Sequence, residues 1–137
     1  MIRKYENKDR AEIERIHEES GFDYKFPDID DPLYIVKFVA EENGKVVESL
    51  CCKLVLNINL YVDPQAGTPQ SRWETLKRLV ESAKKEAWSR GLDEAYAMVP
   101  AEIEKQFAKR LKKLGMTKDR DGWKKWQIDL TEYTPEQ

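Results

Sequence analysis

Few residues in this chain of 137 could act as nucleophiles, bases or metal ligands. The one histidine, His17, follows the apolar Ile13 and Ile16, and a lone histidine beside such a stripe is far more often a boundary residue than a catalyst. Cys51 and Cys52 are neighbours, a spacing that suits neither a tetrahedral zinc site nor an ordinary intrachain disulfide. We expect no metal site, and any Ser-His-Asp or Cys-His arrangement would need His17, to which we assign no role.

A second group of chemically capable residues lies between Phe22 and Pro32, where three aromatic residues alternate with four aspartates and two prolines. The segment predicts a packed loop or a short helix. One interpretation is an acidic, aromatic-lined rim that receives a cationic amine. The other is turn and cap chemistry from the aspartates, with the aromatic rings as anchors. The second interpretation is favoured.

The composition limits the class of partner. Hydrophobic residues make up 40% of the chain, enough to bury one core. With 24 Lys and Arg against 26 Asp and Glu, no bulk basic field exists to hold a nucleic acid or an anionic membrane, so we expect neither. No secretory h-region follows Met1 and no long apolar run occurs. We therefore expect a cytoplasmic protein with reduced thiols.

The N-terminal part must position these groups through one strand and one helix. Residues 2–6 form a short alternating stretch, which predicts a strand. Asn7 is expected as the N-cap of a helix whose first turn contains Asp9, and Ser20 and Gly21 are expected to end it.

A hairpin follows. Residues 34–41 and 45–53 are strand-like, and Asn43-Gly44 between them is a strong two-residue turn signal. Apolar residues then continue on even positions as far as Val62. Because one strand of that length would exceed a domain of this size, we expect a bend around residues 55–59.

The C-terminal half predicts a long helix capped by Thr68-Pro69 and ended at Arg90-Gly91. A short buried strand at 95–99 and a helix from Pro100 to Gly115 should follow. The pattern also predicts a closing hairpin over residues 116–130, with a turn at Asp121-Gly122, and a frayed tail at 131–137.

This order of elements predicts an α/β fold of mixed α+β type, with helices on both faces of a sheet. The chain resembles the GNAT superfamily of N-acetyltransferases from Ile2 to about Leu130. The stretches that carry the resemblance are IRKYENKDRAEIERI, LYVDP before a helix, and RLKKLGM. It implies one domain over residues 1–130, built on a central mixed, mostly antiparallel sheet of about six to seven strands.

The resemblance also implies a site for acetyl-CoA. In that family the acyl-CoA pyrophosphate sits on backbone amides of a glycine-rich turn at a helix N-terminus. Aligned on LYVDP, the corresponding cofactor-binding positions here are Val62, Gly67, Thr68, Gln70, Ser71 and Arg72. The amides of Gln70 and Ser71 would point from the helix N-terminus, and Arg72 would offer a fork to phosphate.

The chain departs from the family pattern at the same place. Thr68 and Pro69 stand among the positions of the family's small residues, and Pro69 removes one N–H donor. Leu111 occupies the position of the tyrosine that often acts as general acid, and Asn57 and Asn59 lie where a carboxylate base is frequent. The remaining phenols are Tyr24, Tyr61 and Tyr96, each more simply a half-buried residue with a wet hydroxyl. The catalytic residues are therefore unassigned.

Three functions remain open. The resemblance implies an acyl-CoA-dependent N-acetyltransferase that transfers an acetyl group to a small-molecule or peptide amine. The missing glycines favour a catalytically inactive GNAT-fold module that binds or regulates. The third is an interaction domain that uses the basic helix at 105–113 on an acidic partner, although that run is most simply a solvated face. An exposed apolar sheet edge leaves a homodimer possible.

Overall fold

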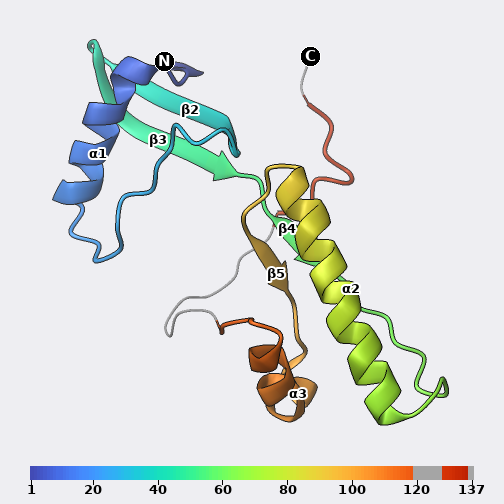
Figure 1. Ribbon diagram of the computed structural model, residues 1–137. Helices are drawn as coiled ribbons and strands as arrows, with labels where there is room; N and C mark the ends of the chain where they lie inside the picture. The colour runs from blue at the N-terminus through green and yellow to red at the C-terminus, as the bar shows by residue number, and fades with distance from the viewer. Residues whose placement is uncertain (119–127, 136–137) are drawn as a thin grey trace. The chain divides into compact units, whose positions relative to one another are not determined.

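The computed structural model describes residues 1–118 and 128–135. In that part of the chain the elements follow one another as β1 (Ile2–Lys4), the 3-10 turn η1 (Asn7–Asp9), α1 (Arg10–Glu19), β2 (Tyr34–Glu42), β3 (Lys45–Lys53), β4 (Leu56–Ile58), α2 (Pro69–Ser89), β5 (Ala95–Ala97) and α3 (Ala101–Lys113) (Figure 1). The chain divides into two compact units, Met1–Met98 and Val99–Gln137. The expectation of one domain over residues 1–130 stays a prediction.

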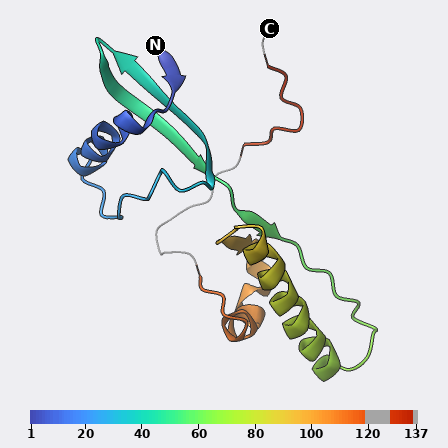
Figure 2. The same ribbon diagram turned by 45° about the horizontal axis from the view of Figure 1, so that its top comes forward.

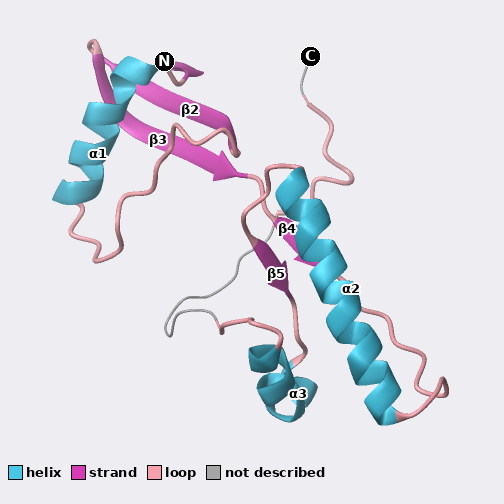
Figure 3. Ribbon diagram, in the orientation of Figure 1, coloured by secondary structure: helices cyan, strands magenta, loops and turns pink. Residues whose placement is uncertain are grey.

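The fold is a mixture of helices and two small sheets (Figure 3). Strands β1, β2 and β3 form an antiparallel sheet in that order, and β4 pairs with β5 in parallel. The mixed α+β class is therefore confirmed. The expected single sheet of six to seven strands is not: the described residues form five strands in two separate sheets.

The break between the sheets has a local cause. Only Leu54 and Val55 separate β3 from β4, and neither residue favours the positive φ that a two-residue reversal needs. The chain therefore cannot turn back at this point to place β4 antiparallel to β3. The interruption lies at the start of the expected bend. The regular strand structure also ends sooner than the alternating apolar residues predicted: β4 ends at Ile58, and residues 59–62 are not in a strand.

The start of the first helix differs from the expectation. Asn7 is not an N-cap but the first residue of η1, and α1 begins at Arg10. The residue before the turn is Glu6, whose amide donates to the Asp9 carboxylate at 2.8 Å. The Asp9 side chain reaches this amide because it folds back along the turn toward Glu6. The end of α1 at Ser20, followed by Gly21 at φ 75°, is confirmed.

The central hairpin is confirmed as well. Asn43 and Gly44 join β2 to β3 with φ angles of 52° and 76°, the left-handed conformation that a tight hairpin turn requires at both positions. Ala40 lies opposite Glu48, and the register shifts by one residue between Ala40 and Glu41.

The buried core lies between this sheet and α1 (Figure 2). It consists of Ile13, Ile29, Val39 and Val46, each at most 8% exposed. Helix α1 thus covers one face of the sheet. Ile29 explains why the segment at 22–32 is held in place although it has no regular structure: its side chain is 2% exposed.

An ion-pair cluster closes the same unit beside β1. The Arg3 guanidinium donates to both oxygens of Asp9, at 2.8 and 2.9 Å, and to the Glu41 carboxylate at 2.6 Å. Asp9 is 3% exposed. The hydrogen bonds from Arg3 lower the pKa of the Asp9 carboxyl to about 2.

The opposite face of the sheet carries apolar side chains that the described residues leave open. Val36 and Phe38 on β2 are paired with Cys52 and Leu50 on β3. Phe38 is 39% and Leu50 is 65% exposed. Helices were expected on both faces of the sheet, but among the described residues the sheet of β1, β2 and β3 has a helix, α1, on one face.

The helices of the C-terminal half follow their predicted boundaries. Thr68 caps α2, Pro69 is its first residue, and Gly91 follows its end at φ 78°. Pro100 precedes α3, and Gly115 follows it at φ 85°.

The strands of this half agree less well. β5 covers three of the five expected residues and is not buried: Tyr96 is 42% exposed. None of the side chains in α2, which joins β4 to β5, is buried either. The closing hairpin falls mainly on residues 119–127, outside the described residues. Its described ends, 116–118 and 128–130, are not in strands.

Candidate functional site

The first turn of α2 is stabilised by a reciprocal cap. The Ser71 amide donates to the Thr68 hydroxyl at 3.0 Å, and the Thr68 amide donates to the Ser71 hydroxyl at 2.9 Å. The Ser71 hydroxyl in turn donates to the Thr68 carbonyl. Two short polar side chains three residues apart can satisfy each other's amides in this way. The Ser71 amide is therefore already engaged by the protein.

In the first turn of α2, the backbone amide of Gln70 is the one that stays available to a ligand. Pro69 has no N–H group, and the Arg72 amide donates to the Thr68 carbonyl at 3.0 Å. No hydrogen bond joins the Gln70 amide to any of the described residues. Of the two amides expected to face a phosphate, the structure thus leaves one available, at the positive end of the helix dipole.

Arg72 folds back over the turn that precedes α2. Its Nη1 donates to the carbonyls of Ala66 and Gly67, at 2.9 and 3.3 Å. Within residues 1–118 and 128–135, its Nε and Nη2 make no hydrogen bond. The guanidinium thus holds the turn with one nitrogen and keeps two for an anion.

Gly67 has little room for a side chain. Its φ is 59°, and a Cβ atom there would collide with the Ser71 hydroxyl. Glycine is therefore needed both for the backbone angle and for the approach of the helix cap.

These residues surround an open hollow of about 270 Å³. Four of the six predicted cofactor-binding residues line it, namely Val62, Gly67, Ser71 and Arg72. Thr68 and Gln70 are not in its lining, although Thr68 holds Ser71 in place. The other lining residues are Tyr61, Asp63, Ala66, Thr75, Leu76 and Leu79.

The hollow has an apolar wall and one charge of each sign. Leu76 and Leu79 come from the first three turns of α2 and were expected only as a packing stripe. Arg72 is its basic residue, whereas the Asp63 carboxylate, which accepts from the Gln65 amide at 2.9 Å, would repel a phosphate. Asp63 was not predicted as a site residue. It lies between Val62 and Gly67, two residues that were, and this position was the signal in the sequence that could have found it.

The pairing between the parallel strands β4 and β5 is short. Three residue pairs join β4 to β5, and the last is Ile58 with Ala97. Neither residues 59–63 nor residues 98–100 continue the strand pairing. The two chain segments that leave the carboxyl ends of β4 and β5 are thus not paired with each other. The hollow itself is lined by residues between 61 and 79, which follow β4 and begin α2.

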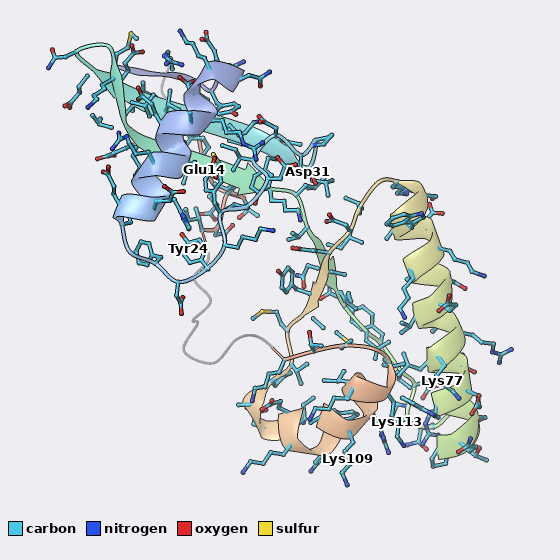
Figure 4. All side chains as sticks on the ribbon, turned by 60° about the vertical axis from the view of Figure 1, so that its left-hand side comes forward. Glu14, Tyr24, Asp31, Lys77, Lys109 and Lys113 are labelled. Atoms are coloured by element: carbon cyan, nitrogen blue, oxygen red, sulfur yellow. The ribbon has the colours of Figure 1, made fainter. Side chains whose placement is uncertain are left out.

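The three phenols named from the sequence lie in different surroundings. Tyr61 borders the hollow and is 88% exposed. The Tyr96 hydroxyl donates to the Glu94 carboxylate at 3.2 Å, just before β5. Tyr24 packs edge-on against His17, whose ring also meets Phe26 (Figure 4). The structure brings only Tyr61 to the hollow.

The remaining candidates have structural roles. Asp28 and Asp31 accept from the amides of Asp30 and Leu33, which confirms turn chemistry for the segment at 22–32. Asp28 and Asp30 both bind Arg10. These carboxylates are therefore occupied and do not form an empty amine-binding rim.

No group of histidine, cysteine and acidic side chains in the described ranges could hold a metal ion. Cys51 and Cys52 are both free, the first half-buried and the second exposed. Nor does any helix in this part of the chain have the length and apolar character needed to cross a bilayer.

Comparisons with known proteins do not identify a family for this chain. No protein-family model and no curated protein matches the chain. A solved structure of a predicted acetyltransferase with acetyl-CoA from Clostridium acetobutylicum is similar over 97% of each chain, with 19% sequence identity and a TM-score of 0.31. A score at that level does not establish a shared fold.

Proposed function

We propose that the protein is an acyl-CoA-dependent N-acetyltransferase-like protein that transfers an acetyl group to a small-molecule or peptide amine. The observation that carries the proposal is the hollow at the N-terminus of α2, the helix that joins the parallel strands β4 and β5. A strand–helix–strand unit with such a hollow suits a ligand that carries a phosphate.

The residues of the hollow and of the adjoining first turn of α2 fit such a ligand in part. The Gln70 amide and the free nitrogens of Arg72 are the donors available for a diphosphate. The apolar side chains of Val62 and Leu76 would face the uncharged arm of the same ligand. The engaged Ser71 amide and the nearby Asp63 carboxylate weaken this fit. We therefore expect weak binding.

Acetyl-CoA supplies an activated acyl group, because an amine can attack a thioester carbonyl directly. The new C–N bond forms as the C–S bond breaks, and the proton lost by the amine ends on the released thiol. Among the residues lining the hollow, Tyr61 is the one with a dissociable hydroxyl, and its exposure gives it no preset orientation. The protein's contribution is therefore to hold the two reactants side by side.

A specific observation favours the alternative, an inactive module that binds without catalysis. Thr68 and Ser71 satisfy each other without a ligand, and Leu111 in α3 cannot donate a proton. In this alternative the hollow retains a ligand but releases no product.

Titration calorimetry with CoA and with acetyl-CoA tests the shared part of both functions. We expect binding in the high micromolar to millimolar range, weakened about tenfold or more in Arg72→Glu because charge-assisted bonds to phosphate are lost. Arg72→Gln keeps an N–H donor for the Ala66 carbonyl and separates loss of charge from loss of the turn. Arg78→Glu, which changes the same charge at an exposed position of α2, is the matched control.

The outcomes separate the alternatives. No heat of binding for wild-type protein at millimolar ligand would reject both. Binding together with thiol release in the presence of a panel of amines supports the transferase. Binding without thiol release supports the inactive module.

A further inference from the structure

Helix α3 carries a one-sided charge pattern that the proposed function does not use. Its lysines fall at intervals of four, three and one residues, which places them within about a third of the helix circumference. They are Lys105, Lys109, Lys112 and Lys113, and all four are exposed. Lys109 and Lys113 both project from α3 (Figure 4). We call these four residues the lysine stripe.

The lysine stripe is not neutralised by ion pairs in the described part of the chain. None of its four ammonium groups forms an ion pair there, whereas Lys118, outside the helix, binds Glu104 at 2.9 Å. Like charges four residues apart destabilise a helix, and the chain as a whole is nearly balanced, with a net charge of −2. A concentrated cationic face in such a chain is therefore a local feature rather than a result of composition.

The remaining cation of the helix has a different environment. The Arg110 guanidinium lies 5.6 Å from the centre of the Phe107 ring, a cation–π distance. The apolar residues Ile103, Phe107, Leu111 and Leu114 lie on the opposite side of the helix from the lysine stripe, by the same 3.6-residue geometry. The stripe thus stands apart from the side of the helix that is suited to packing.

We propose that the lysine stripe binds an acidic protein segment. The stripe extends over nine residues, and its two ends are eight residue steps or about 12 Å apart at 1.5 Å per step, which matches about four residues of an extended peptide. Four ammonium groups would meet carboxylates on such a segment one to one, and complementary charge guides both encounter and register.

Two observations favour a protein partner over a nucleic acid or a membrane. The stripe contains lysines but no aromatic ring on which a base could stack, and Glu102 at its N-terminal end would repel a continuous phosphate backbone. A long polyanion would also meet the net negative charge of the chain. A short acidic segment avoids both.

The test uses a fluorescently labelled peptide of six glutamates and the full chain. We expect anisotropy to report binding at low ionic strength, and the affinity to fall steeply between about 0.05 M and 0.3 M salt. In Lys109→Glu/Lys113→Glu the affinity should fall about tenfold or more, because two attractions become repulsions. Lys84→Glu/Lys85→Glu, at exposed positions of α2, should bind as the wild type does.

Lys109→Gln/Lys113→Gln provides a milder change and should show an intermediate loss, with helix content checked by circular dichroism for every variant. Absence of peptide binding at low salt would overturn the proposal. So would an equal loss in the α2 control, since the effect would then come from overall charge. Tighter binding of a single-stranded oligothymidine, or of vesicles containing phosphatidylserine, than of the peptide would also overturn it.

Discussion

Asp9 is the ionisable side chain on which the N-terminal unit most depends. It is buried, it satisfies the Glu6 amide, and it receives both arms of Arg3. Replacing Asp9 by Asn should lower the free energy of unfolding by about 2 kcal/mol, because Arg3 loses one of its two anionic partners and keeps only Glu41. Urea denaturation at neutral pH measures the loss. Glu18→Gln, at an exposed position of α1, should change stability little.

The same pair predicts a pH dependence. The pKa of Asp9 is lowered from 3.8 to about 2 in the folded protein, so its contribution to stability is complete above the ordinary value. It is lost as the pH falls through about 2. The difference in unfolding free energy between wild type and Asp9→Asn should therefore shrink as the pH is lowered from about 5 toward 2. A difference that stays constant over that range would contradict the role given to Asp9.

Local side-chain bonds could be predicted from the sequence, and distant ones could not. The Thr68 hydroxyl was expected to cap an amide and does so at Ser71, because both groups lie within one turn of chain. The bond from Arg3 to Glu41 depends on the pairing of β1 with β2. No spacing in the sequence reveals that pairing, so Asp9 was assigned only to the helix dipole.

Helix α2 offers a prediction about its cap. Thr68→Ala removes the acceptor of the Ser71 amide and should destabilise the start of the helix by about 1 kcal/mol. If the cap competes with a bound phosphate, the freed amide should also strengthen CoA binding. Thermal unfolding and calorimetry measure the two effects, and Ser82→Ala, at an exposed position within α2, is the control. Weaker CoA binding in Thr68→Ala would instead show that the cap shapes the site.

Boundaries marked by special residues were predictable. Asn43-Gly44, Thr68-Pro69 and Gly115 impose a backbone angle or a cap by their own chemistry, so their effect does not depend on the rest of the fold. Strand ends that no such residue marks could not be predicted. β4 stops at Ile58 although apolar residues continue on alternate positions, because strand pairing needs a partner as well as a pattern.

The distribution of buried residues predicts where the protein opens first. Among the described residues, the four buried apolar side chains belong to α1, β2, β3 and the segment at 22–32, whereas α2 and α3 bury none. Hydrogen exchange followed by mass spectrometry should therefore show slower exchange of amides in β2 and β3 than in α2. Equal protection of α2 would mean that its apolar side is covered in solution.

The number of strands in one sheet was beyond what the sequence could predict. Each strand pattern states that a segment can pair, but which edge it joins depends on the reversals between strands. At Leu54-Val55 there is none. The candidate site could be predicted better than the sheet. The residues from Val62 to Arg72 are close in sequence, and Gly67 and the helix cap determine the turn between them.

Glu12 on α1 reaches across to the outer border of the sheet, where its carboxylate accepts from the Val46 amide at 2.8 Å. β3 is an edge strand of its sheet, and an amide on such an edge would otherwise be open to a strand from another molecule. The helix thus places a negative charge where intermolecular β-stacking would start. Resistance of the folded protein to edge-to-edge association is in this respect a consequence of its tertiary structure, because the helix and not the strand supplies the protecting carboxylate.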